Sequence, residues 1–233
     1  MHKILLNCDL GEWESREQTR QLMRHLDLAN IACGGHAGSI ETISYCHSIA
    51  RDFGVKTGAH PGLPDGGRSD ASKLTCEEFE ILLRTQIEAY LSSGAKLHHI
   101  KLHGSLYHLS ESRPDIRDAY LNFAAQQNCA IVCLAGGQVA YHAQSRNIPV
   151  LPEAFLDRSY QANGSLIPRD QSNATIHDLD LITRRLDQLA THQPITANDG
   201  SLINIIAQTV CVHSDSKNSL TILKTARKHL NAL

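Results

Sequence analysis

The chain has 233 residues, of which 42% are hydrophobic and 20% are charged, a balance typical of a folded domain rather than a disordered chain. Its 22 basic and 24 acidic residues give a formal net charge of −2, so no basic excess indicates a nucleic acid or an anionic membrane as partner. The seven cysteines form no C-x-x-C pair, and no apolar run of eighteen residues occurs. The apolar run in the first nine residues is too short for a signal peptide, so we expect none. We therefore expect a cytoplasmic protein with free thiols, bound neither to nucleic acid nor to a membrane.

Short apolar runs alternate with amphipathic segments and no linker divides them, so we expect one domain spanning residues 1–233. In chain order, the expected strands are Ile4–Asp9, Leu28–Cys33, Val55–His60, His99–His103, Ala130–Ala135, Val150–Phe155 and Thr209–His213. The expected helices are Ser15–Leu26, Glu77–Leu91, Pro114–Gln127, Ser172–Ala190 and Ser216–Leu233. Strands alternating with helices at about 33 residues per unit favour a parallel α/β barrel, with an open doubly wound sheet as the alternative.

Most of the expected strands are apolar along their length and deliver polar side chains at the carboxyl end. These side chains belong to Asp9, Glu12, Asn30, His36, His60, Lys101, His103, Glu153, Asp157, Arg158, His213 and Asp215. Active sites of parallel α/β proteins assemble at this edge of the sheet. The pattern therefore predicts an active site there.

Lys101 is the most informative of these residues, because it interrupts an otherwise apolar strand. Side chains alternate along a strand, so Lys101 shares a face with His103, as Asn7 does with Asp9. Lysine is almost never buried without a partner. An inward-facing Lys101 therefore needs either an anionic ligand or a carboxylate of the chain, such as Asp9 or Glu153.

The residue types at this edge fit three kinds of site. Histidines and carboxylates could hold a divalent metal that activates water. Alternatively, Lys101, Arg158 and Arg169 could bind an anionic substrate while a histidine or carboxylate transfers a proton. A non-catalytic binding subunit is the third possibility. The sequence contains no H-E-x-x-H or G-x-S-x-G motif that would decide between them.

Six segments in the order of the chain carry a more specific signal. They are LNCDLGE (6–12), ANIACGGHAG (29–38), GAHP (58–61) with Pro64, Asp65, Gly67 and Arg68, KLHGSLY (101–107), EAFLDRSY (153–160) with GSLIPR (164–169), and VCVHSD (210–215). Together they resemble the motifs of the LamB/YcsF family, whose members are A-type subunits of 5-oxoprolinase. The resemblance covers nearly the whole chain, from residue 6 to residue 215.

The resemblance implies an irregular (β/α)7 barrel of the glycoside hydrolase/deacetylase-like type. It also implies one subunit of an enzyme that opens 5-oxo-L-proline to L-glutamate with hydrolysis of ATP. ATP with Mg²⁺ is then the expected co-substrate, and subunits of the B and C types are the expected partners, without which the chain should have little activity. A metal-dependent amide or N-acetyl hydrolase and a non-catalytic binding subunit stay open as alternatives.

For this reaction we expect two sets of site residues, and we assign no metal ligands. The expected catalytic residues are Asp9, Glu12, His60, Lys101 and His103. The expected substrate-binding residues are Asn30, His36, Glu153, Asp157, Arg158, Arg169, His213 and Asp215. The sequence departs from the family motifs at Gly35, Ser39, Leu102, Asn163 and Ser214 and in a short loop between Asp65 and Arg68, and we expect these departures to lie at the rim of the pocket.

Overall fold

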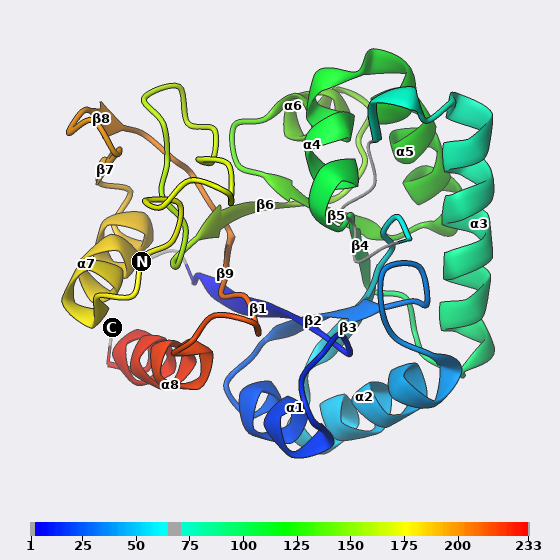
Figure 1. Cartoon of the computed structure of the whole chain (residues 1–233), viewed down its shortest axis with the longest axis horizontal. Helices are drawn as coiled ribbons and strands as arrows, with labels where there is room; N and C mark the ends of the chain where they lie inside the picture. The colour runs from blue at the N-terminus through cyan, green and yellow to red at the C-terminus, as the bar shows by residue number, and fades with distance from the viewer. Residues whose placement is uncertain (1–2, 65–70, 233) are drawn as a thin grey trace.

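A closed barrel of seven parallel strands forms the centre of the computed structural model, which describes residues 3–64 and 71–232 (Figure 1). The barrel strands are β1 (Leu5–Leu10), β2 (Leu28–Ala32), β3 (Lys56–His60), β4 (His99–Lys101), β5 (Ala130–Leu134), β6 (Val150–Phe155) and β9 (Thr209–Cys211). They are hydrogen-bonded in this order, and β9 pairs with both β6 and β1. The closure confirms the predicted barrel and excludes the open sheet. A separate antiparallel pair is formed by β7 (Ile195–Thr196) and β8 (Leu202–Ile203).

Helices surround the barrel on the outside (Figure 1). They are α1 (Arg16–Met23), α2 (Ile40–Phe53), α3 (Cys76–Ser92), α4 (Gly104–Ser112), α5 (Pro114–Gln127), α6 (Gln138–Ser145), α7 (Leu179–Ala190) and α8 (Ser219–Leu230), with a short 3-10 helix, η2, at Ala71–Lys73. Several of them follow residues that cap the first turn. Ser15 accepts a hydrogen bond from the Gln18 backbone in front of α1, and Asp178 accepts one from the Leu181 backbone in front of α7.

The alternation of side chains in β1 divides the barrel into two environments. Leu6, Cys8 and Leu10 are fully buried in the hydrophobic core. Asn7 and Asp9 point the other way, toward the polar side chains of the other strands inside the barrel. The apolar layer holds the barrel and its helices together, and the interior is left for polar groups.

The structure confirms the seven predicted barrel strands and corrects several boundaries. β4 ends at Lys101 and β9 at Cys211, so His103 and His213 lie beyond their strands. The segment 172–178, expected to be helical, precedes α7, and α8 ends at Leu230. Helices α2, α4 and α6 and the pair β7–β8 were not predicted.

All seven cysteines are free, as expected, and all except Cys76 are buried. Within the described residues, no helix combines the length and the apolar character needed to cross a bilayer. Asp65, Gly67 and Arg68 of the third motif, with the short loop that contains them, lie outside the described residues.

Candidate active site

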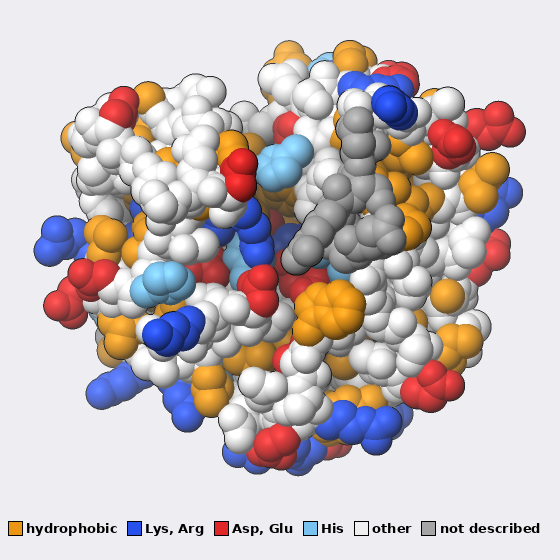
Figure 2. Space-filling model, viewed as in Figure 1, with side chains coloured by type: hydrophobic (Ala, Val, Ile, Leu, Met, Phe, Trp, Pro, Cys, Tyr) orange, Lys and Arg blue, Asp and Glu red, His pale blue; other side chains and the backbone are white. Residues whose placement is uncertain are grey.

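Polar side chains from six of the barrel strands and the loops that follow them meet inside the barrel and at its carboxyl-terminal mouth. Figure 2 shows a hollow in the centre of one face of the molecule, where acidic, basic and histidine side chains gather. The deeper side chains come from the strands themselves, as Asn7, Asn30 and Lys101 do. Those nearer the mouth come from the loops, as Glu12 and His36 do. This arrangement agrees with the predicted edge.

The deepest layer is a chain of neutral hydrogen-bonding side chains. The amide of Asn30 donates to Asn7 Oδ1 at 2.9 Å and to Asp9 Oδ1 at 2.7 Å, while Asn30 Oδ1 lies 2.8 Å from His99 Nε2. Asn7 in turn donates to the Thr209 hydroxyl at 2.8 Å. Burial holds the pKa of His99 well below its usual value, so its ring is neutral. Asn30, expected to bind substrate, is fully buried and instead orients the carboxylate of Asp9.

Lys101 lies above this layer, enclosed by partners from the chain itself. Its ammonium is 2.9 Å from Asp9 Oδ1, 2.9 Å from Glu153 Oε1 and 3.2 Å from Cys211 Sγ. Tyr107 donates its hydroxyl to the other oxygen of Glu153 at 3.2 Å. Of the two kinds of partner expected for Lys101, the structure therefore provides carboxylates of the chain. Glu153, expected to bind substrate, is fully buried in this pair.

Electrostatics keep the Lys101 pair ionised. Burial disfavours the charge on Lys101, but Asp9, Cys211 and Glu153 outweigh it and raise its pKa well above the usual value. Burial likewise raises the pKa of Asp9, but His60 and Lys101 outweigh it and hold that pKa well below its usual value. An ammonium and a carboxylate 2.9 Å apart thus stabilise each other inside the barrel.

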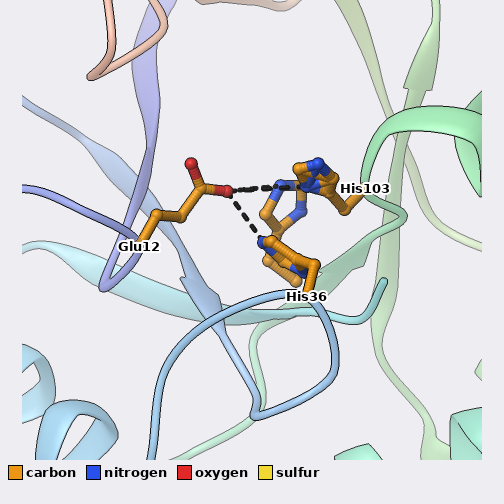
Figure 3. A group of neighbouring side chains, drawn as sticks. Glu12, His36 and His103 are labelled. Carbon is orange, nitrogen blue, oxygen red and sulfur yellow. Dashed lines mark hydrogen bonds and ion pairs between the residues drawn. The ribbon is translucent and has the colours of Figure 1, made fainter. Parts of the chain in front are cut away.

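Four side chains at the mouth form the cluster that we call the Glu12 cluster: Glu12, His36, His60 and His103. Glu12 Oε1 lies 2.8 Å from His36 Nε2, 3.7 Å from His60 Nε2 and 3.6 Å from His103 Nδ1. Figure 3 shows the contacts of this single oxygen with His36 and His103. One ligand atom from each residue lies within 4.8 Å of all the others, a spacing that could hold a metal ion.

The three histidines of the cluster differ in their surroundings. Burial lowers the pKa of His36 and of His103, so both rings are neutral near pH 7. Burial also disfavours the charged form of His60, but Asp9 outweighs it and raises the pKa of this ring. His60 Nδ1 donates to the Lys101 carbonyl at 2.7 Å, which directs Nε2 toward Asp9 Oδ2, 3.4 Å away, and toward Glu12.

Asp157 and His213 form a pair of their own. His213 Nδ1 and its backbone N–H both lie 3.0 Å from Asp157 carboxylate oxygens, and its ring stacks on Phe155. Burial raises the pKa of Asp157, but His213 outweighs it and lowers that pKa below the usual value. These contacts fix His213 beside the mouth.

The two expected arginines differ in their accessibility. Arg158 is buried and donates to the backbone carbonyls of Ala174 at 3.3 Å and Ile167 at 2.6 Å, which braces the loop that follows β6. Arg169 lies at the exposed rim and pairs with Asp215 at 2.9 Å. Arg169 is thus better placed than Arg158 to meet an anionic substrate.

Contrary to expectation, the departures from the family motifs do not all lie at the rim. Leu102 is buried in the hydrophobic core, and Asn163 makes a turn with Ser165 in an exposed loop. A Cβ on Gly35 would lie 2.2 Å from the Gly62 carbonyl and 2.3 Å from Gln86 Nε2, so a side chain does not fit there.

Three partners of the site were missed by sequence analysis: His99, Tyr107 and Cys211. The alternation that places Lys101 inside the barrel also places His99 there, so this histidine could have been found from the same signal. Tyr107 and Cys211 reach Glu153 and Lys101 through contacts between distant parts of the chain, for which the sequence carries no local signal.

Comparisons with known proteins identify the family of the chain. The chain matches the LamB/YcsF family over residues 4–233. The 5-oxoprolinase A-type subunit of Vibrio cholerae is 35% identical over 242 residues, which cover 98% of each protein. That of Limosilactobacillus fermentum is 34% identical over 241 residues, which cover 100% of this chain and 97% of the relative.

Solved structures give the same picture at the level of the fold. The lactam utilization protein from Thermus thermophilus superposes with a TM-score of 0.88 at 30% identity, over 99% of this chain and 96% of that one. A family 4 carbohydrate esterase from Streptomyces lividans has a TM-score of 0.52 at 11% identity over 99% of this chain and 88% of that one, and shares the fold alone. The family match and the identity to relatives along the full length lead to one conclusion: the chain belongs to the LamB/YcsF family.

Proposed function

We propose that this chain is a subunit of an ATP-dependent 5-oxoprolinase and that 5-oxo-L-proline is opened to L-glutamate at its barrel mouth. The observation that carries the proposal is the match along the full length to relatives named as 5-oxoprolinase A-type subunits, 98% of each protein in the case of Vibrio cholerae. The name of the Thermus thermophilus protein, lactam utilization, points to the same class of substrate, a cyclic amide.

The chemistry of a cyclic amide explains the need for ATP. A five-membered lactam is a poor electrophile, and transfer of a phosphoryl group from ATP to its oxygen makes the ring carbon reactive. Water then adds to that carbon, the ring C–N bond breaks as the nitrogen takes up a proton, and a carboxyl phosphate remains. A second water hydrolyses it to glutamate and phosphate. Mg²⁺ enters with the nucleotide.

The residues of the mouth fit three roles in this reaction. Asp9, ionised and 9% exposed, can accept the proton of the attacking water. Arg169 can meet the carboxylate or phosphoryl group at the rim. Lys101 holds Asp9 in place and maintains its charge. Subunits of the B and C types would then supply or activate the nucleotide, because the sequence contains no P-loop motif.

The test is reconstitution of the chain with partner subunits of the B and C types, followed by measurement of glutamate and ADP. We expect turnover only with ATP and all subunits, and a kcat lowered about 10²- to 10⁴-fold in Asp9→Asn, as for loss of a general base. Asp52→Asn, at an exposed carboxylate paired with Arg20, is the matched control and should leave kcat unchanged.

Two outcomes would contradict the proposal. Glutamate formation that needs no ATP would remove the phosphoryl step. Hydrolysis of N-acetyl or linear amide substrates by the chain alone would instead favour the metal-dependent amide hydrolase.

A further inference from the structure

We propose that the Glu12 cluster binds a divalent transition-metal ion of the Zn²⁺ type through Glu12, His36, His60 and His103. Three imidazoles and one carboxylate are the ligand set of Zn²⁺ and its neighbours in the first transition row. Mg²⁺ prefers oxygen ligands and keeps several waters, so this ion would be distinct from the Mg²⁺ that accompanies ATP.

The distances in the cluster are close to those that a tetrahedral ion requires. Ligand atoms about 2.0–2.1 Å from a central Zn²⁺ lie roughly 3.4 Å from one another. Glu12 Oε1 is 3.7 Å from His60 Nε2 and 3.6 Å from His103 Nδ1, while its 2.8 Å contact with His36 Nε2 must open by about half an ångström to admit an ion. All four ligand atoms lie within 4.8 Å of one another, so side-chain shifts of roughly an ångström would bring them to the spacing of a tetrahedral site.

The histidines are held in the manner of metal ligands. His60 donates its Nδ1–H to the Lys101 carbonyl at 2.7 Å, which leaves Nε2 directed into the cluster. The side chain of His36 is 0% exposed and that of His60 is 2% exposed, so both are fixed by packing. Gly62 backs His36, because a Cβ there would lie 2.4 Å from its Nδ1.

One of the proposed ligand atoms also lacks a hydrogen-bond partner within the described part of the chain. Among the described residues, nothing hydrogen-bonds His103 Nδ1, although the atom is buried, and its nearest carboxylate oxygen, on Glu12, is 3.6 Å away. A buried polar atom without a partner costs free energy. An ion at the centre of the cluster would bind this atom.

A second group of potential ligands, Asp9, Cys211 and His213, is the alternative position for a metal. The Lys101 ammonium lies 2.9 Å from Asp9 Oδ1 and 3.2 Å from Cys211 Sγ, so a positive charge already occupies that position. Repulsion by Lys101 disfavours a second cation there. The Glu12 cluster is therefore the better position.

An ion bound here would be adjacent to the proposed base. Asp9 Oδ2 lies 3.4 Å from His60 Nε2, one of the proposed ligands. Four protein ligands fill a tetrahedral ion and leave no open position for water or substrate, so the ion would act by fixing these ligands beside Asp9 and by adding positive charge near the reacting centre. Only this chemical role rests on the proposed function; the binding of the ion does not.

The experiment is a calorimetric titration of the chain alone with ZnCl₂, after removal of any histidine tag and of bound metal by a chelator. We expect one Zn²⁺ per chain, no displacement by millimolar Mg²⁺, and tetrahedral absorption bands when Co²⁺ replaces Zn²⁺. His103→Ala should weaken binding more than about 100-fold, beyond the loss caused by residues that only orient ligands. Glu12→Gln is the second variant in case His103→Ala does not fold, as checked by circular dichroism.

His213→Asn is the matched control, because it removes a histidine of the alternative group, and it should leave the affinity for Zn²⁺ unchanged. Loss of binding in His213→Asn but not in His103→Ala would place the ion in the alternative group and overturn the proposal, as would the absence of stoichiometric Zn²⁺. The titration uses neither ATP nor partner subunits, so failure of the proposed reaction would not alter its result.

Discussion

Replacement of Lys101 by methionine tests how charge is balanced inside the barrel. The ammonium lies 2.9 Å from carboxylate oxygens of both Asp9 and Glu153. The side chains of all three residues are at most 9% exposed. Methionine keeps most of the volume of the lysine stem and removes the charge. The substitution therefore leaves two carboxylates close together in the interior without a compensating lysine.

Removal of one partner of a buried ion pair costs about 3–5 kcal/mol, because the other charge is left buried and unpaired. In a chain of this size, a loss of 1 kcal/mol lowers Tm by about 2–4 °C, so we expect Lys101→Met to lower Tm by roughly 6–20 °C. If Lys101 had been an unpaired ligand for substrate, the same change would have left stability unchanged or higher.

The assay is thermal unfolding of three variants near neutral pH. Lys101→Met/Glu153→Gln should be more stable than Lys101→Met, because one of the two uncompensated charges is removed. Lys228→Met, at an exposed lysine in α8, should change stability by no more than about 0.5 kcal/mol. An unchanged Tm in Lys101→Met would refute the charge pairing, and retained turnover in the reconstituted complex would refute a role for Lys101 in catalysis.

Three further predictions concern pH and packing. Burial lowers the pKa of His36, His99 and His103, so the unfolded chain binds more protons than the folded chain below about pH 6.5. We therefore expect the metal-free chain to lose stability as pH falls from 7.5 to 5.5, by up to about 1.4 kcal/mol per pH unit for each ring, while the raised pKa of His60 acts in the opposite sense. Denaturant unfolding that showed greater stability at pH 5.5 would contradict this. Asp157→Asn should lower the free energy of unfolding by about 1–3 kcal/mol at pH 7. Because the pKa of Asp157 is lowered in the folded chain, the difference in stability from wild type should fade as pH falls below about 4. A constant difference across this range would exclude an ionic contribution from Asp157. Gly62→Ala should weaken Zn²⁺ binding, since the added methyl would lie 2.4 Å from His36 Nδ1, and unchanged affinity in the same titration would show that His36 is not held by this packing.

The barrel strands could be predicted because parallel strands are buried on both faces. Such strands appear as short apolar runs, and Val150–Phe155 was predicted with the observed bounds of β6. The helices are less evident where local signals are weak. Helix α4 begins at Gly104 without a side-chain cap and contains three serines. Helix α6 follows Gly137, which has no side chain to cap it, and its first N–H groups are bound instead by the distant carboxylate of Glu111. Packing against the barrel stabilises these helices, and packing is not visible in the local sequence.

The site shows the same division between local and long-range information. Alternation along β1 and β4 placed Asp9 and Lys101 inside the barrel, and the structure confirms this. Glu153, from β6, was named beside Asp9 as a possible partner of Lys101, but alternation could not show that both carboxylates would share the ammonium, because the contact with Glu153 depends on the closure of the barrel across its interior. Nor did it reveal that Arg158 would bond to its own loop, since that depends on a conformation without periodicity.

Asp9 connects the two charged layers of the site, and its two oxygens are not equivalent. Oδ1 accepts hydrogen bonds from Asn30 at 2.7 Å and from Lys101 at 2.9 Å, so side chains of the barrel interior fix its position. Oδ2 lies 3.2 Å from the same ammonium and 3.4 Å from His60 Nε2, and so faces the Glu12 cluster. A proton acceptor placed in this way can act on a water molecule at the mouth without rotating, because the bonds to Oδ1 hold the carboxylate plane. The neutral layer of Asn7, Asn30 and His99 therefore contributes to the proposed chemistry through orientation alone.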